Sequence, residues 1–181
     1  VIQYPMSNTS WAAPKPADEG YQIAYSVDAD GNSIYTADMT DEQKYEAALQ
    51  ASISFFKAAG YTFDEATGKF TAAPEGAEMT YEVIIPGGGT GDHPAFGILT
   101  AAKEALATIG ITLQINDPSD SSVWNNALEA NTAEMWAGAW GATVDPDMYQ
   151  VYHSDNANGK GTNSNHYSIE DADLDEMIIA A

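Results

Sequence analysis

The residues best suited to chemistry lie in a glycine-rich loop at positions 86–93, Pro-Gly-Gly-Gly-Thr-Gly-Asp-His. The loop separates a predicted strand from a predicted helix N-terminus, where backbone N–H groups can hold an anion or a ligand carbonyl. It is not a nucleotide-binding loop, because Asp-His follows its last glycine where a Walker sequence needs Lys and Ser or Thr. The dinucleotide fingerprint fails as well, since Asp92 replaces its third glycine. We therefore expect a flexible loop at the edge of a cleft or, alternatively, a specific ligand contact through Gly88, Gly89 and His93.

No other set of residues forms a catalytic or metal-binding pattern. The sequence contains no Gly-x-Ser-x-Gly nucleophile elbow. His93, His153 and His166 lack the i, i+4 spacing of a helical metal pair, so a metal site would require them to converge in space. The segment Asp-Ala-Asp-Gly-Asn at 28–32 resembles the start of a calcium loop, but its glycine is fourth rather than sixth, which favours a hairpin turn. We expect no catalytic residue, no cofactor and no metal, and hence a protein that is not an enzyme.

The net charge of the chain limits the kinds of molecule that it can be expected to bind. The 181 residues include 27 Asp and Glu against 6 Lys and no Arg, which gives a formal net charge of −21. Nucleic-acid binding needs a basic field and guanidinium groups, so we expect no nucleic acid as a partner. The acidity indicates a solvated surface or, alternatively, a field that attracts cationic ligands. The absence of cysteine excludes disulfides and thiolate chemistry. No stretch approaches the ~20 apolar residues of a membrane-spanning helix, and we expect any secretion signal to lie outside this sequence.

The first 75 residues predict an irregular segment, two hairpins and a helix. Prolines make residues 1–20 irregular, and alternating residues around the turn at 28–32 predict a β-hairpin from Tyr21 to Tyr35. Apolar residues recur every three or four positions over 41–59, with Thr40 as a possible N-cap, which predicts a helix. Short β-prone runs on either side of a turn at 66–68 predict a second hairpin.

Strands and helices then alternate, which predicts an α/β fold with a mixed, largely parallel sheet and right-handed crossovers. The predicted elements are a strand at 79–85, a helix at 94–109, a strand at 111–115, a helix at 121–130 and a strand at 134–140. A long polar passage at 145–167 follows, of a kind that is more often functional or held by tertiary contacts than idle. The sequence ends within a predicted amphipathic helix, so we expect it to be truncated.

Tryptophans are the third group of candidate functional residues. Trp124 and Trp136 suit either a core or a ligand shelf, and we favour the core. Trp140 is predicted to end the last strand between Gly138 and Gly141, where the backbone is open to close approach.

The order of these segments resembles the family 5 extracellular solute-binding proteins of ABC transporters, the dipeptide and oligopeptide binders. The resemblance covers about residue 41 to the end and rests on Phe-Phe-Lys-Ala-Ala-Gly-Tyr at 55–61, Leu-Ala-Thr-Ile-Gly-Ile at 106–111, Ala-Trp-Gly-Ala at 139–142, Asp-Pro at 145–146, and Asn163, Tyr167 and Leu-Asp at 174–175. Family members are much longer than this chain, and the matched region is similar to the middle of the second lobe of a two-lobed clamp.

The resemblance implies a fold, partners and a location. Residues 1–40 would be a connector with a β-hairpin, and residues 41–181 a partial C-terminal lobe of the class II periplasmic-binding-protein type. The partners implied are a peptide or other small solute, the permease subunits of an ABC transporter, and the missing first lobe of the same protein. The implied location is extracytoplasmic, in the periplasm or at the cell surface as a lipoprotein anchored outside this segment. A non-transport extracellular interaction module is the alternative.

The resemblance also implies a ligand site. In the family, the strand that ends in the tryptophan pairs with the main chain of an extended peptide, a role that maps onto Ala139, Trp140 and Gly141. Thr143 stands where peptide binders carry an aspartate for the ligand's amino group. Asp145 or Asp147 could replace that aspartate, or the ligand could be a metal chelate or a sugar without a free amino terminus.

Overall fold

The computed structural model describes residues 5–19, 21, 24–141 and 144–181, and it divides into two compact units. The first, which we call the hairpin unit, comprises residues 16–83 and 93–116. The second, the pocket unit, comprises the residues up to Lys15 together with 84–92 and 117–181. Each unit contains part of the α/β fold and is described by itself.

The first helix of the hairpin unit confirms the prediction from periodicity. Helix α1 spans Asp41–Ala58. The Thr40 hydroxyl accepts a hydrogen bond from the Gln43 backbone N–H at 3.3 Å, and the Gln43 side chain accepts one from the Thr40 N–H at 2.8 Å. This reciprocal capping box satisfies two N–H groups that the helix itself leaves unpaired. Gly60 follows the helix with φ of 94°, a conformation that glycine adopts without steric cost.

The second predicted hairpin is present and forms one side of the unit's core. Strands β1 (Thr62–Asp64) and β2 (Lys69–Ala72) pair antiparallel, with Phe63 opposite Phe70. Their rings lie 4.8 Å apart in an edge-to-face arrangement, and Tyr61 also packs edge-on against Phe70. The buried members of the core cluster are Ile53, Tyr61, Phe70, Ile109 and Ile111.

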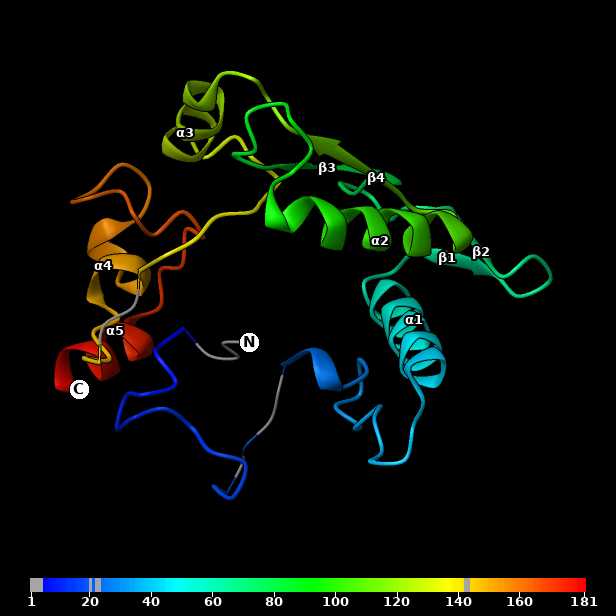
Figure 1. The fold of residues 1–181 in the computed structure, drawn as a ribbon, viewed down its shortest axis with the longest axis horizontal. Coiled ribbons are helices and arrows are strands. Elements are labelled where there is room, and N and C mark those ends of the chain that lie inside the picture. The colour runs from blue at the N-terminus through cyan, green and yellow to red at the C-terminus, as the bar shows by residue number, and fades with distance from the viewer. Residues whose placement is uncertain (1–4, 20, 22–23, 142–143) are drawn as a thin grey trace. The chain divides into compact units, whose positions relative to one another are not determined.

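The main sheet confirms the α/β fold with parallel strands flanked by helices (Figure 1). Strands β3 (Thr80–Ile84), β4 (Thr112–Asn116) and β5 (Met135–Trp136) have the order β4-β3-β5. Helix α2 (Pro94–Thr108) follows β3 and packs against β4. Helix α3 (Ser121–Glu129) connects β4 to β5. This alternation of strands and helices is the pattern predicted from the sequence.

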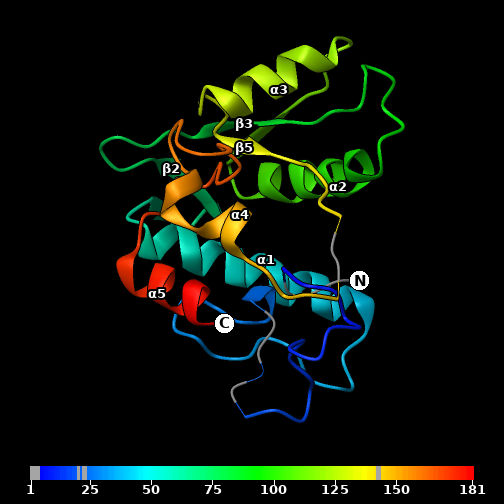
Figure 2. The same cartoon turned by 90° about the vertical axis from the view of Figure 1, so that its left-hand side faces the viewer.

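The polar passage is folded rather than extended. Helix α4 (Tyr149–Tyr152) is followed by a short 3-10 helix, η2 (Ser154–Asn156), and an isolated parallel bridge joins Ala157 to Asn165. Helix α5 (Ala172–Ala180) lies beside α4 in both cartoon views (Figures 1 and 2). The passage therefore belongs to the ordered part of the pocket unit.

Two sequence predictions need correction. Among the described residues of the first predicted hairpin, one antiparallel bridge joins Val27 to Ser33, and Ala24–Ser26 forms the 3-10 helix η1 instead of a strand. Gln22 and Ile23, which the prediction also covered, lie outside the described residues. The turn itself is present, and the Asp28 carboxylate accepts hydrogen bonds from the N–H groups of Asp30 and Asn32. The strand predicted at 134–140 ends at Trp136. None of the helices that the structure describes combines the length and apolar character needed to cross a bilayer.

Candidate ligand-binding pocket

An aromatic cavity of about 630 Å³ lies within the pocket unit. The chain segments around it come from α3, from β5 and the residues after it, and from the turn that precedes α5. Its walls include Trp124, Trp136, Trp140, Tyr167, His166 and Glu134. The volume falls within the range of small-molecule sites, which are concave and mostly lined by apolar and aromatic groups.

Trp124 is held by a hydrogen bond to the residue that follows the last strand. Its indole Nε1 donates to the carbonyl oxygen of Ala137 at 3.0 Å. The ring lies against Gly138, where an added Cβ would come within 3.1 Å of the Trp124 Cζ2 atom. Glycine at position 138 therefore allows the indole to lie close to the backbone, and a larger residue would require the ring to shift by a few tenths of an ångström. The next bond of the parallel ladder would run from the N–H of residue 86 to the Ala137 carbonyl, but residue 86 is a proline and has no N–H, so pairing stops after Trp136 and the carbonyl accepts the indole N–H instead.

The residues after β5 leave their main chain available. Ala137 donates its N–H to the Ile84 carbonyl, but among the described residues Gly138, Ala139, Trp140 and Gly141 make no backbone hydrogen bond. These residues are exposed, and the Trp140 side chain retains 57% of its accessible surface. Exposed peptide groups beside an apolar cavity can pair with the main chain of an extended ligand.

Tyr167 and His166 form another part of the cavity wall. The Tyr167 ring is tilted by 37° against Trp136 at 5.3 Å and is stacked on Tyr152 at 5.7 Å. Burial, together with the Tyr167 hydroxyl, raises the pKa of Tyr152 above its ordinary value. The His166 ring stands perpendicular to Trp136, and its Nδ1 atom is buried with no hydrogen-bond partner in the described part of the chain. The wall is thus a connected set of aromatic rings.

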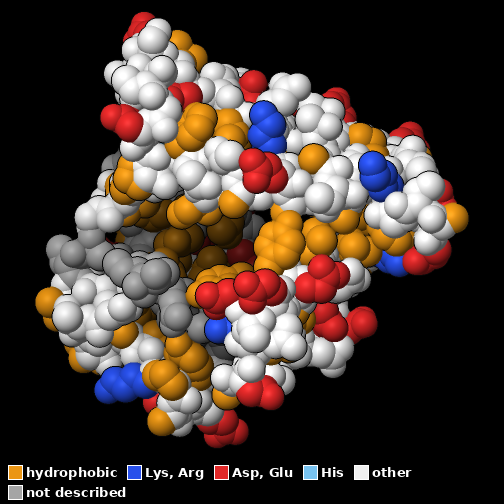
Figure 3. Space-filling model, turned by 45° about the vertical axis from the view of Figure 1, so that its right-hand side comes forward, with side chains coloured by type: hydrophobic (Ala, Val, Ile, Leu, Met, Phe, Trp, Pro, Cys, Tyr) orange, Lys and Arg blue, Asp and Glu red, His pale blue; other side chains and the backbone are white. Residues whose placement is uncertain are grey.

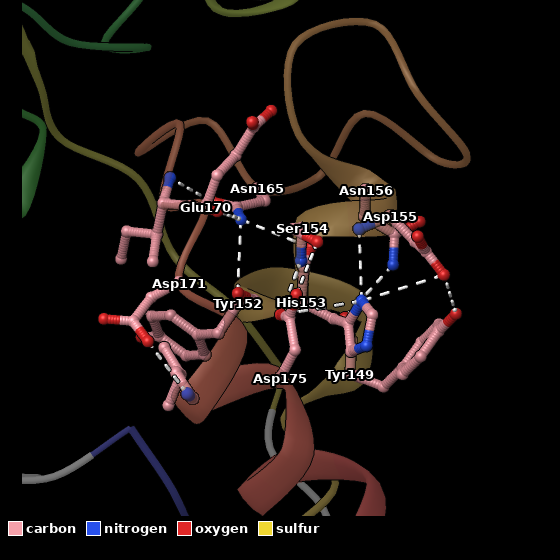
Figure 4. Close-up of polar contacts among 12 residues, drawn as sticks. Tyr149, Tyr152, His153, Ser154, Asp155, Asn156, Asn165, Glu170, Asp171 and Asp175 are labelled. Carbon is pink, nitrogen blue, oxygen red and sulfur yellow. Dashed lines mark hydrogen bonds and ion pairs between the residues drawn. The ribbon is translucent and has the colours of Figure 1, made fainter.

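Two asparagines hold the passage that carries this wall (Figure 4). The Asn165 side chain is fully buried and donates to the carbonyls of Tyr152, His153 and Ile169 at 2.9–3.3 Å. Its Oδ1 accepts the Ile169 N–H at 3.3 Å. Asn156 in turn accepts from the Thr162 N–H at 2.9 Å and donates to the Tyr149 carbonyl at 3.1 Å. We call these contacts the asparagine clasp. Buried polar groups of this kind fix a conformation when every member is satisfied.

A second polar cluster ties α5 to η2, and its geometry is not that of a catalytic triad (Figure 4). The Ser154 hydroxyl donates to Asp175 at 2.5 Å rather than to His153. His153 accepts the Asp155 N–H through Nδ1, which lies 3.7 Å from Asp175. The hydrogen bonds from Ser154 hold the pKa of Asp175 below its ordinary value. A triad needs the serine hydroxyl on the histidine, so this cluster fastens a helix instead.

The glycine-rich loop binds a carboxylate of its own chain. Asp117 accepts hydrogen bonds from the backbone N–H groups of Gly89 at 3.1 Å and Gly91 at 3.2 Å. An added Cβ at Gly87 would lie 2.5 Å from the Asp117 Oδ1 atom, so a side chain there would displace the carboxylate. The loop has the N–H concavity expected for an anion site, and Asp117 occupies it.

The predicted ligand residues lie in several places. Ala139 and Trp140 border the aromatic cavity, and Gly141 is exposed next to them. Gly88 and Gly89 belong to the loop held by Asp117, while Asp145 borders a separate cavity together with Asp147, Met148 and Met177. His93 belongs to the hairpin unit, where its Nδ1 accepts the Ala95 N–H and caps α2. Thr143 lies outside the described residues.

Sequence reasoning missed part of the cavity wall. Trp124 and Trp136, for which we favoured the core, are half-buried and line the cavity instead. The sequence indicates Tyr167 only through its place in the family pattern, and His166 only as a member of a metal site that would require distant histidines to converge. Their position beside an Asn-rich, Gly-rich passage was the available signal, because such passages fold back through side-chain hydrogen bonds. No group of three or more His, Asp and Glu within the described ranges is arranged to hold a metal ion.

Comparisons with known proteins identify the fold. No family model matches the sequence, and no curated protein is significantly similar to it. The crystal structure of NikZ from Campylobacter jejuni in complex with Ni(L-His) matches with a TM-score of 0.51 and 16% identity, over 75% of this chain and 25% of NikZ. The oligopeptide-binding protein AppA from Bacillus subtilis, in complex with a nonapeptide, matches with a TM-score of 0.56 and 17% identity, over 88% of this chain and 30% of AppA. The chain therefore has the α/β fold of part of these proteins and spans less than a third of their length.

Proposed function

We propose that this chain is most of one lobe of a two-lobed, extracytoplasmic solute-binding protein of an ABC importer. The aromatic cavity and the main chain of residues 138–141 would form this lobe's share of the ligand site. The ligand is a peptide or a related small solute, which the two lobes enclose and deliver to the permease subunits. Residues 41–181 are the lobe, and residues 1–40 connect it to the rest of the protein.

The observation that carries this proposal is the exposed main chain beside the cavity. Gly138 to Gly141 leave their peptide groups unpaired among the described residues. Gly138 and Ala139 line the same cavity as the rings of Trp124, Trp136, Trp140, His166 and Tyr167. Main-chain pairing gives affinity for any extended peptide, while the pocket selects among side chains. The fold shared with AppA, which was solved with a nonapeptide, supports the same conclusion.

Trp140 provides the sharpest test. Because its side chain is 57% exposed, truncation to alanine removes little packing from the lobe itself. We expect Trp140→Ala in the full-length protein to weaken ligand binding by about 2 kcal/mol, as a hot-spot aromatic does, and to leave the melting temperature nearly unchanged. Trp11, which is 77% exposed and lies outside the cavity, supplies the matched control Trp11→Ala.

Titration calorimetry with a nonapeptide, and separately with Ni(L-His), measures these affinities. The 181-residue chain should bind either probe more weakly than the full-length protein, because a ligand enclosed between two lobes loses about half its contacts when one is absent. If folded Trp140→Ala binds the ligand with unchanged affinity, the cavity is not part of the ligand site. Micromolar or tighter binding by the 181-residue chain alone would contradict the two-lobed arrangement.

A further inference from the structure

The cavity combines aromatic faces with a negative environment. Its walls contain three tryptophans, one tyrosine and the Glu134 carboxylate, and none of its described lining residues is a lysine. The whole chain carries a formal charge of −21 and has no arginine. In the space-filling view, the red carboxylates outnumber the blue lysines over the visible face (Figure 3). A ligand that enters this cavity therefore meets no lysine or arginine side chain among the described lining residues.

Two of the rings are held in place by contacts within the chain. The Trp124 indole N–H donates its hydrogen bond to the Ala137 carbonyl, so Trp124 lines the cavity with an apolar ring whose N–H is already satisfied. Tyr167 is supported from behind by Tyr152, to which it is nearly parallel at 8°. Trp140 keeps 57% and Tyr167 keeps 47% of their accessible surface, so both rings can still be covered by a ligand.

Resting on the proposed function, we propose that the part of the ligand that enters this cavity is cationic: an alkylammonium, quaternary ammonium or guanidinium group. Aromatic faces attract such groups through their quadrupole, most strongly when the cation leaves water. The acidic field of the chain adds a longer-range attraction of the same sign. A neutral side chain of equal size would gain the same apolar contact without either electrostatic contribution, so charge is the property to test.

Two matched pairs of probes isolate the charge and separate two possible sources of the cation. Choline and its neutral isostere 3,3-dimethylbutan-1-ol represent a small quaternary amine. N-acetyl-lysine amide and N-acetyl-norleucine amide represent a basic peptide side chain. Tryptophan fluorescence of the full-length protein is titrated with each probe at about 0.15 M salt and again at about 0.5 M, because added salt screens nonspecific attraction to the acidic surface. We expect the cation of at least one pair to bind about 3- to 30-fold more tightly than its neutral partner.

Variants assign the preference to the cavity. Trp140→Leu keeps an apolar side chain but removes a ring, and should reduce the cation preference. Trp11→Leu makes the same change at an exposed site outside the cavity and should leave the preference intact. A larger gain in the choline pair indicates a quaternary amine, and a larger gain in the lysine pair indicates a basic peptide.

Equal binding within both pairs, or no binding by either cation, would overturn the cationic specificity. A cation preference that is unchanged in Trp140→Leu would also overturn it, because the attraction would then lie elsewhere on the acidic surface. None of these outcomes decides whether the protein binds a solute, because the calorimetric titrations of Trp140→Ala test that separately. Peptide binding by the full-length protein together with equal affinity within both pairs would retain solute binding and remove only the preference for charge.

Discussion

Replacing Asn165 tests whether the asparagine clasp holds the cavity wall. The Nδ2 group has two hydrogens shared among three carbonyls, and Oδ1 accepts one N–H, so alanine removes about three hydrogen bonds. At about 1 kcal/mol for each net hydrogen bond, Asn165→Ala should cost about 3 kcal/mol. Because Asn165 immediately precedes two wall residues, His166 and Tyr167, the loss should also loosen the cavity.

Hydrogen exchange at the Ile169 amide is the direct assay, since that N–H donates to Asn165. A local loss of 3 kcal/mol corresponds to about 100-fold faster exchange. Asn165→Asp preserves the side-chain volume but points an oxygen at the carbonyls, so it should destabilise the passage more than alanine does at neutral pH. Asn126→Ala, at an exposed position on α3, is the control. Unchanged Ile169 exchange and unchanged melting in Asn165→Ala would refute the clasp.

Two further outcomes follow from other contacts. Asp117→Ala should accelerate amide hydrogen exchange at Gly89 and Gly91, because both N–H groups lose their acceptor. Asp117→Asn keeps one acceptor oxygen and should keep part of the protection. Equal exchange in the unmodified protein and both variants would show that Asp117 does not occupy the loop. Burial, with the neighbouring Tyr81, raises the pKa of Tyr61 from 10.0 to about 12, so the folded state favours the neutral phenol. Its contribution to stability is complete below pH 10.0 and should be lost as the pH rises towards 12. Denaturant titrations against pH should show a weaker alkaline loss in Tyr61→Phe, and an unchanged alkaline loss would refute this assignment.

Locally encoded elements could be predicted from the sequence. Helix α1 was defined by its apolar spacing and by Thr40 and Gln43, whose side chains make the capping box without help from the rest of the chain. The β1–β2 hairpin depended on a short turn between two β-prone runs, and its pairing is equally local. Such elements are specified by neighbours a few residues away, so their sequence signal is complete.

The cavity could be predicted only in part, because distant residues determine it. Trp140 was identified from the glycines beside it. The position of the Trp124 ring, however, depends on its hydrogen bond to Ala137, which lies 13 residues further along the chain. Likewise, periodicity indicates nothing about which carbonyls a buried Asn165 will meet. Asn158 and Asn163 adopt positive φ, a conformation that asparagine tolerates better than most residues, so the enrichment of the passage in asparagine is a local sequence signal of its fold.

The Asp117 carboxylate acts as a tethered competitor at the glycine-rich loop. A group attached to the same chain has an effective concentration in the millimolar range or above, so a free anion at lower concentration loses to it. The loop amides are also bonded before any ligand arrives. A carboxylate or phosphate on an incoming solute would therefore gain no binding energy here until Asp117 moved away. The loop amides are consequently withheld from an anionic ligand by prior occupancy, and the negative charge of the Asp117 carboxylate adds electrostatic repulsion.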